Sequence, residues 1–202
     1  MSRNNVMKHR SNDLLVREDA SKTQLGFWIY LMTDVMLFGA LFATFLVLRA
    51  NTYGGPTEKE LYHLPFILTE TILLLASSYS CGLAVLALHK RNLTQVIALL
   101  ALTFVLGSVF LAMEMTEFTQ LVSEGNSWQA SASLSSFFTL VATHGLHITV
   151  GLLWLSVVVW QLLRKGITAN TERKTMLFSM FWHFLDVIWI FIFTIVYLIG
   201  VA

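Results

Sequence analysis

Residues 93–113 read LTQVIALLALTFVLGSVFLAM and contain no charged side chain, which makes this stretch the clearest guide to the fold. About 20 apolar residues in a row are enough to cross a hydrocarbon core of about 30 Å as a helix. Four further apolar segments of comparable length occupy residues 26–48, 64–88, 134–163 and 175–200. In lipid each segment must satisfy its own backbone hydrogen bonds, so the sequence predicts an all-α integral membrane bundle of five transmembrane helices.

The composition supports the same class of protein. Of the 202 residues, 56% are hydrophobic and only 12% are charged, which is too few charges to cover a water-soluble domain. The short connections predict one transmembrane domain, residues 26–202, after a polar and solvated N-terminal tail, residues 1–25, without a signal peptide. The only cysteine, Cys81, lies in an apolar segment, which excludes an internal disulfide and a cysteine-based metal cage.

The distribution of lysine and arginine predicts how the bundle is oriented. Eleven of the thirteen basic residues fall in the tail and in the second and fourth connections, which share one side of the membrane. The other side holds only Arg49 and Lys59. Because basic residues are retained on the cytoplasmic side, we expect a cytoplasmic N-terminus and a C-terminus outside.

Ionisable side chains inside the apolar segments are the candidate functional residues, because such groups are costly in lipid and usually face the bundle interior. At a rise of about 1.5 Å per residue, Asp34 and His183 lie at similar depth in the cytoplasmic half, and Glu70 and Glu117 lie toward the outer face. This places an inner and an outer polar cluster in the bundle. The buried polar candidates are Asp34, Glu70, Glu117, His144, His147, His183 and Asp186.

Two functional interpretations compete with a purely structural one. His144 and His147 share a helix face, but His147 and His183 differ in depth by roughly 13 Å, too far for a haem held between two histidines. We therefore expect interhelical hydrogen bonds at these histidines rather than a metal or cofactor site. The carboxyl groups of Asp34, Glu70 and Glu117 could form a proton path, or they could be neutral groups with a structural role. We favour the structural role.

Small residues predict where helices approach closely. Gly39, Gly82, Gly145 and Gly151 lie within the apolar segments, where the absence of a side chain lets backbones meet. The sequence contains no nucleotide-binding loop and no water-exposed serine, histidine and acid arrangement. We therefore expect no catalytic residue in this chain and no nucleic-acid partner.

Two motifs are more specific than membrane patterning. Residues 143–151 read THGLHITVG and residues 182–189 read WHFLDVIW. They resemble the His-Gly-x-His-x-x-x-Gly and Trp-His-Phe-x-Asp-x-x-Trp signatures of the haem–copper oxidase subunit III family. Residues 26–34, GFWIYLMTD, are similar to the family's first helix and place Asp34 at its buried carboxylate, where many members have Glu. Glu117 matches a family Glu before an aromatic residue, and the resemblance covers nearly all of the chain after residue 25.

The number of helices indicates a branch of the family. Long members have seven helices, whereas five resembles the cytochrome bo type of bacterial quinol oxidase. Residues 54–57 (GGPT) and 64–66 (LPF) are similar to that branch as well. Some bacterial cytochrome c oxidases also have a five-helix subunit III, so cytochrome c stays open as the electron donor. An independent membrane cytochrome and a small transporter are more remote alternatives.

The resemblance implies a non-redox accessory subunit of a proton-pumping oxidase that reduces oxygen to water in the bacterial inner membrane. Its partners would be the catalytic subunit, which would hold the haems and copper, the other oxidase subunits, and phospholipid bound in a cleft. Asp34 would be the family's buried carboxylate, and His183 is its possible partner by depth. The basic residues that could hold lipid headgroups are Arg17, Lys22, Arg164 and Arg173.

Overall fold

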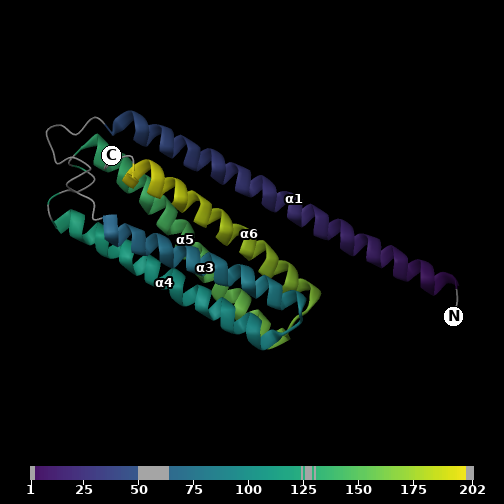
Figure 1. Cartoon of the computed structure of the whole chain (residues 1–202). Coiled ribbons are helices and arrows are strands. Elements are labelled where there is room, and N and C mark those ends of the chain that lie inside the picture. The colour runs from purple at the N-terminus through teal and green to yellow at the C-terminus, as the bar shows by residue number, and fades with distance from the viewer. Residues whose placement is uncertain (1–2, 50–63, 124, 126–128, 130, 199–202) are drawn as a thin grey trace. The chain divides into compact units, whose positions relative to one another are not determined.

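The computed structural model describes residues 3–49, 64–123, 125, 129 and 131–198, and the regular structure in this part of the chain is entirely helical (Figure 1). The helices are α1 (Arg3–Leu48), α3 (Leu64–His89), α4 (Leu93–Ser123), α5 (Ala132–Lys165), α6 (Ala169–Ile192) and the short π-helix η1 (Phe193–Leu198). Five helical stretches among the described residues are long and apolar enough to cross a membrane. The predicted five-helix membrane fold is confirmed, and its orientation in the membrane stays a prediction.

Three helix ends differ from the hydropathy pattern. The polar tail is helical from Arg3 onward, although the stretch suited to a membrane begins only at Ser21. Helix α4 continues beyond its apolar core to Ser123, as the spacing of its glutamates predicts. Helix α6 begins at Ala169, earlier than predicted, because a capping box closes its first turn: the hydroxyl of Thr168 accepts from the backbone N–H of Thr171 at 3.3 Å.

The chain forms two compact units, residues 1–37 and residues 38–202. The first unit contains the N-terminal part of α1. The second contains the rest of α1 and helices α3 to α6, and all of the contacts described below lie within it.

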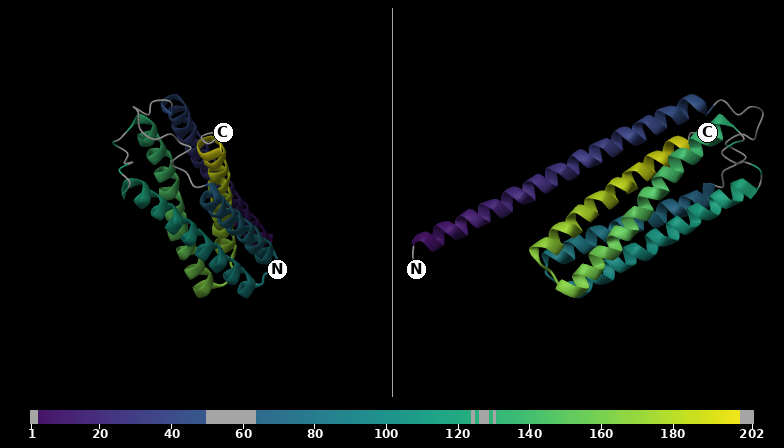
Figure 2. Two further views of the ribbon diagram at one scale, coloured as in Figure 1. Left: turned by 60° about the vertical axis from the view of Figure 1, so that its left-hand side comes forward. Right: turned by 180° about the vertical axis from the view of Figure 1, so that it is seen from behind.

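Helices α3 to α6 form a closed ring of neighbours. Helix α3 packs against α4 and α6, and α5 packs against the same two helices (Figure 1; Figure 2). Short connections join α3 to α4 and α5 to α6, so these neighbours are antiparallel, as in an up-and-down bundle. Both short connections lie at one end of the bundle, here named the basic end. At the opposite end, here named the acidic end, α4 ends, α5 begins and η1 ends.

Local chemistry closes the turns at the basic end. Arg91 adopts a positive φ of 54° after α3, and the side-chain oxygen of Asn92 accepts from the backbone of Gln95 at 3.3 Å to cap α4. Gly166 ends α5 with a φ of 66°, which favours glycine. The fold thereby gathers six basic side chains at this end: Lys90, Arg91, Arg164, Lys165, Arg173 and Lys174. This is the end that the charge distribution predicts to face the cytoplasm.

Exposed hydroxyl groups on the outside of the second unit bond to their own helices. Thr44 donates to the carbonyl of Ala40 at 2.8 Å, and Thr139 donates to the carbonyl of Ser135 at 2.7 Å. The same bond to a preceding turn is made by Thr69, Thr143 and Thr194. A hydroxyl satisfied in this way needs no water, which suits a surface that faces lipid.

Candidate functional site

The interior of the basic half is organised by one tryptophan. Trp182 of α6 is almost fully buried, and its indole lies where α4 and α5 both present a glycine. A Cβ atom on Gly107 would come within 2.8 Å of this ring, and one on Gly151 within 2.9 Å. The indole N–H donates to the hydroxyl of Ser77 in α3 at 3.1 Å. One side chain therefore ties together four helices, which confirms close approach at Gly151 and adds Gly107, which the sequence analysis did not single out.

Hydroxyl groups continue from this tryptophan between α3 and α4. The Ser77 hydroxyl donates to the carbonyl of Thr103 at 3.1 Å, and the hydroxyls of Ser80 and Thr103 share a hydrogen bond of 2.8 Å. All three residues are buried. Because these polar groups satisfy one another, they stabilise the α3–α4 packing at little desolvation cost.

His183 finds its partner in α3. Its Nδ1 shares a hydrogen bond of 2.7 Å with the hydroxyl of Ser78, and the buried Asp186, one turn further along α6, lies beside the same hydroxyl. A Cβ atom on Gly82 would lie 3.8 Å from the imidazole of His183, an ordinary van der Waals distance. Interhelical bonding is what we expected of this histidine, although its partner was not foreseen. Asp34 lies in α1 within the N-terminal unit, and its pairing with His183 stays a prediction.

The two histidines of α5 have different surroundings. His144 is fully buried and stacks on Trp189 of α6, with ring centroids 5.3 Å apart and an interplanar angle of 29°. His147 is half-buried, and its Nδ1 bonds to the carbonyl of Thr143 in its own helix at 2.7 Å. Both imidazoles flank the ring of Phe38, at 6.3 and 5.3 Å respectively. The interhelical hydrogen bond predicted for His144 is absent among the described residues, because aromatic rings surround its imidazole. The helix face that the two histidines share is an aromatic packing surface.

Near the acidic end the interior is lined with carboxyl groups. Glu70 of α3 and Glu114 of α4 are almost fully buried, and Glu117 of α4 is half-buried. Glu117 accepts a hydrogen bond of 3.3 Å from the hydroxyl of the buried Tyr197 in η1. The sequence predicted Glu70 and Glu117 at this level, but it assigned Glu114 to no cluster and gave no role to Tyr197.

Glycine also makes room for Glu114. A Cβ atom on Gly145 of α5 would lie 2.9 Å from one carboxyl oxygen of Glu114 and 3.0 Å from the other. The carboxyl group therefore reaches across to α5, directly beside His144 in the sequence. This close approach was predicted for Gly145, whereas a Cβ atom on Gly39, predicted alongside it, would meet nothing within 4 Å beyond its own turn of helix in the part of the chain that the structure describes.

The ionisable groups of the described residues do not assemble a metal site. No set of three or more His, Cys, Asp or Glu side chains in residues 3–49, 64–123 and 131–198 is arranged to hold an ion. The histidines of α5 and α6 instead contact hydroxyl, carbonyl and aromatic groups. The hydroxyl groups of Ser77, Ser78, Ser80 and Thr103 thus belong to interhelical hydrogen bonds that hold the bundle together.

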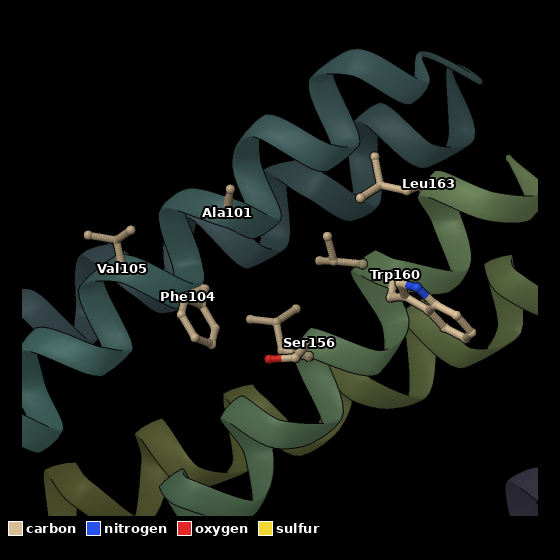
Figure 3. A pocket seen from close by; sticks show the side chains of 8 residues that line it. Ala101, Phe104, Val105, Ser156, Trp160 and Leu163 are labelled. Carbon is tan, nitrogen blue, oxygen red and sulfur yellow. The ribbon is translucent and has the colours of Figure 1, made fainter.

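An apolar groove of about 370 Å³ lies between α4 and α5 (Figure 3). Its lining residues are Ala101, Phe104, Val105, Leu155, Ser156, Val159, Trp160 and Leu163. The guanidinium carbon of Arg164 lies 5.5 Å above the ring of Trp160. A cationic group therefore stands beside the groove in the last turn of α5, at the basic end.

Comparison with known proteins identifies the family. The profile described as "Cytochrome c oxidase subunit III" matches residues 16–201. A relative from Pseudomonas aeruginosa, "Cytochrome bo(3) ubiquinol oxidase subunit 3", is 50% identical over 183 residues, covering 91% of this chain and 88% of the relative. A relative from Bacillus subtilis, "Quinol oxidase subunit 3", is 44% identical, covering 88% of this chain and 87% of the relative. A relative from Staphylococcus aureus, "Probable quinol oxidase subunit 3", is 39% identical, covering 97% of this chain and 98% of the relative.

These matches span the whole bundle, and they confirm the resemblance that the two signature motifs and the first helix carry. The five membrane helices described above fit a multi-pass membrane protein of this kind. This chain belongs to the cytochrome c oxidase subunit III family.

Proposed function

We propose that this chain is the third subunit of a haem–copper quinol oxidase, in which it packs beside the catalytic subunit and stabilises it. The observation that carries the proposal is the 50% identity, over 91% of the chain, to a protein named as subunit 3 of a cytochrome bo(3) ubiquinol oxidase. Relatives from two further genera bear quinol oxidase names and match 88% and 97% of this chain. The bacterial inner membrane would be the location of the complex.

In this proposal the chain supplies no redox group. The haems and copper would belong to the catalytic partner, since the histidines in the membrane helices here do not fit them. His183 engages Ser78 through Nδ1, and His147 engages its own helix. His144 is enclosed by aromatic rings. What this chain contributes is a rigid surface: an interior locked by interhelical hydrogen bonds and an apolar exterior for the partner subunits and lipid.

Purification through an affinity tag on this chain tests the proposal. A mild detergent extract of the native membrane is expected to yield a larger haem-containing subunit together with the tagged chain. The preparation should consume oxygen with ubiquinol as donor and not with reduced cytochrome c. Activity with cytochrome c alone would place the chain in the other branch of the family. Recovery of the tagged chain without any haem protein would refute the accessory role.

We further propose that an anionic phospholipid binds with one acyl chain in the α4–α5 groove. The groove is lined almost entirely by apolar side chains, and Arg164 at its edge can hold a phosphate headgroup. Among the other predicted headgroup residues, Arg173 lies in α6, which contributes no lining residue, and Lys22 lies in the N-terminal unit. The side chain of Arg17 is outside the part that the structure describes.

Replacing Arg164 by Gln is expected to weaken retention of anionic phospholipid by about fivefold, because one basic group near the surface contributes about 1 kcal/mol. The measurement is native mass spectrometry of the purified complex during stepwise delipidation. Arg173→Gln is the matched control and should retain lipid like the unmodified protein. Equal loss in both variants would contradict a site at the groove and indicate a diffuse charge effect.

A further inference from the structure

Two of the three glutamates near the acidic end have a property that structural packing alone does not explain. Glu70 is 0% exposed and Glu114 is 1% exposed. All four of their carboxyl oxygens are buried, and none has a hydrogen-bond partner or basic counter-ion among the described residues. Buried carboxyl groups in folded proteins are normally paired, so this pair requires an explanation.

The three carboxyl groups are close enough to influence one another. Glu70 of α3 interacts electrostatically with Glu117 of α4, and Glu114 interacts with both. The other titratable groups near this cluster are the Tyr197 hydroxyl, which donates to Glu117, and His144, which lies beside Gly145 in α5. No positive charge from α3, α4, α5 or η1 is paired with the cluster within the described residues.

Ionised carboxylates cannot persist in such a place. Moving one unpaired carboxylate into an apolar interior costs several kcal/mol even after relaxation, and neighbouring carboxylates repel each other further. The group that avoids this cost is the neutral carboxyl, which carries an O–H donor and acceptor oxygens. The surroundings of Glu70 and Glu114 therefore favour the protonated form of both side chains.

A second unpartnered polar side chain belongs to the residue next to the glycine that Glu114 approaches. His144 is fully buried, and neither of its ring nitrogens has a hydrogen-bond partner among the described residues. It directly precedes Gly145, against which the carboxyl group of Glu114 lies at 2.9 Å from the position of a Cβ atom. Buried polar groups that lack a protein partner are commonly satisfied by ordered water with two to four partners.

Glu117 supplies the connection to the acidic end. It is only half-buried, whereas the other two carboxyl groups are enclosed. Glu117 lies six residues before the end of α4 at Ser123, or about 9 Å along the helix axis. Tyr197 closes the cluster at the same end and fixes the Glu117 side chain through its hydroxyl.

We propose that Glu70, Glu114 and Glu117 form a proton-binding site, whose exchangeable protons and accompanying water enter from the acidic end by way of Glu117. A hydronium ion at this end gives one proton to the Glu117 carboxylate and leaves as water. Exchange begins when Glu70 or Glu114 releases its own proton through an intervening water to the acidic end, and the carboxyl O–H of Glu117 then replaces that proton by the same route as Glu117 returns to its ionised form. The site holds protons without any change in redox state.

Infrared spectroscopy of the purified complex tests the site through the carbonyl stretch of protonated carboxyl groups. At neutral pH the unmodified protein should show an absorption of this kind that Glu114→Gln and Glu70→Gln each reduce. Glu172→Gln is the matched control, because Glu172 is a half-buried glutamate in the first turn of α6 at the basic end. If neither cluster variant reduces the absorption, both carboxyl groups are ionised and the proposal is wrong.

Exchange into heavy water tests the route. In Glu117→Gln, the carbonyl absorption of Glu70 and Glu114 should shift in D₂O at a rate on the order of tenfold lower than in the unmodified protein. This corresponds to about 1.4 kcal/mol of added barrier. An unchanged exchange rate would overturn entry through Glu117. If Glu114→Gln fails to assemble, the Glu70→Gln variant and the unmodified protein still test the proposal. A carboxyl absorption of the unmodified protein that never shifts in D₂O would exclude a proton site that is accessible from the acidic end.

Discussion

Replacing Trp182 by Ala is expected to lower the free energy of unfolding of the bundle by about 3 kcal/mol. The indole fills the space between Gly107 and Gly151, and neither glycine has a side chain that could collapse into the cavity. The hydroxyl of Ser77 also loses its donor. Because lipid is as apolar as the interior, the loss comes from packing more than from transfer to water, which favours the lower end of the range for buried aromatic residues.

The measurement is thermal denaturation of the purified complex, in which a loss of this size corresponds to a decrease of roughly 6–12 °C in Tm. Trp182→Phe keeps a ring in place and removes the hydrogen bond, so its Tm should fall by much less. Trp28→Ala, at a position that is 47% exposed, is the control for the loss of a tryptophan as such. Equal Tm values for Trp182→Ala and Trp28→Ala would contradict the central role of Trp182.

Alanine at Gly107 or Gly151 is expected to destabilise the bundle by about 1–3 kcal/mol, the usual cost of overpacking. The new methyl group would lie 2.8 Å from Cζ2 of Trp182 in the first variant and 2.9 Å from Cζ3 in the second. These are atoms of a rigid ring enclosed on both sides, so neither can move away without displacing a helix. The decrease in Tm of the purified complex is the measurement.

Gly39→Ala is the matched control, because a Cβ atom there meets nothing within 4 Å and alanine favours the helix by up to about 1 kcal/mol. Its Tm should stay the same or rise. A double variant, Gly107→Ala with Trp182→Phe, should lose less than the sum of its single variants, since Phe lacks the ring atoms that collide with the methyl group. Strict additivity would show that the two positions do not share one packing site.

The helices themselves could be predicted because lipid imposes one local rule on every residue of a span. Uninterrupted apolar runs located α3, α5 and the start of α4 to within two residues, since a helix satisfies its backbone hydrogen bonds within the segment itself. The early start of α6 depended on Thr168 and Thr171, whose mutual capping is a side-chain event that hydropathy does not report. The motifs in α5 and α6 identified the family correctly.

The partners inside the bundle could not be predicted, because they come from helices far apart in the sequence. Depth arithmetic compares positions along the membrane normal and gives no information about rotation of one helix against another. It therefore placed Glu70 and Glu117 at a similar level, but it did not find Ser78 as the partner of His183. Gly107 was passed over for the same reason, since only the position of the Trp182 ring reveals its purpose.

The π-helix η1 at the end of the fifth span changes the direction in which its side chains point around the helix axis. In a regular α-helix eight residues turn through about 800°, which would point Tyr197 roughly 80° away from Trp189. A π turn absorbs one residue, so that Tyr197 follows Trp189 as a seventh residue would, within about 20° of the same direction. The two rings are indeed neighbours, with centroids 6.3 Å apart. Deleting one residue between 193 and 196 would therefore restore a regular helix without moving Tyr197 away from Glu117. A deletion in α6 before Trp182 would instead rotate the entire signature motif, residues 182–189.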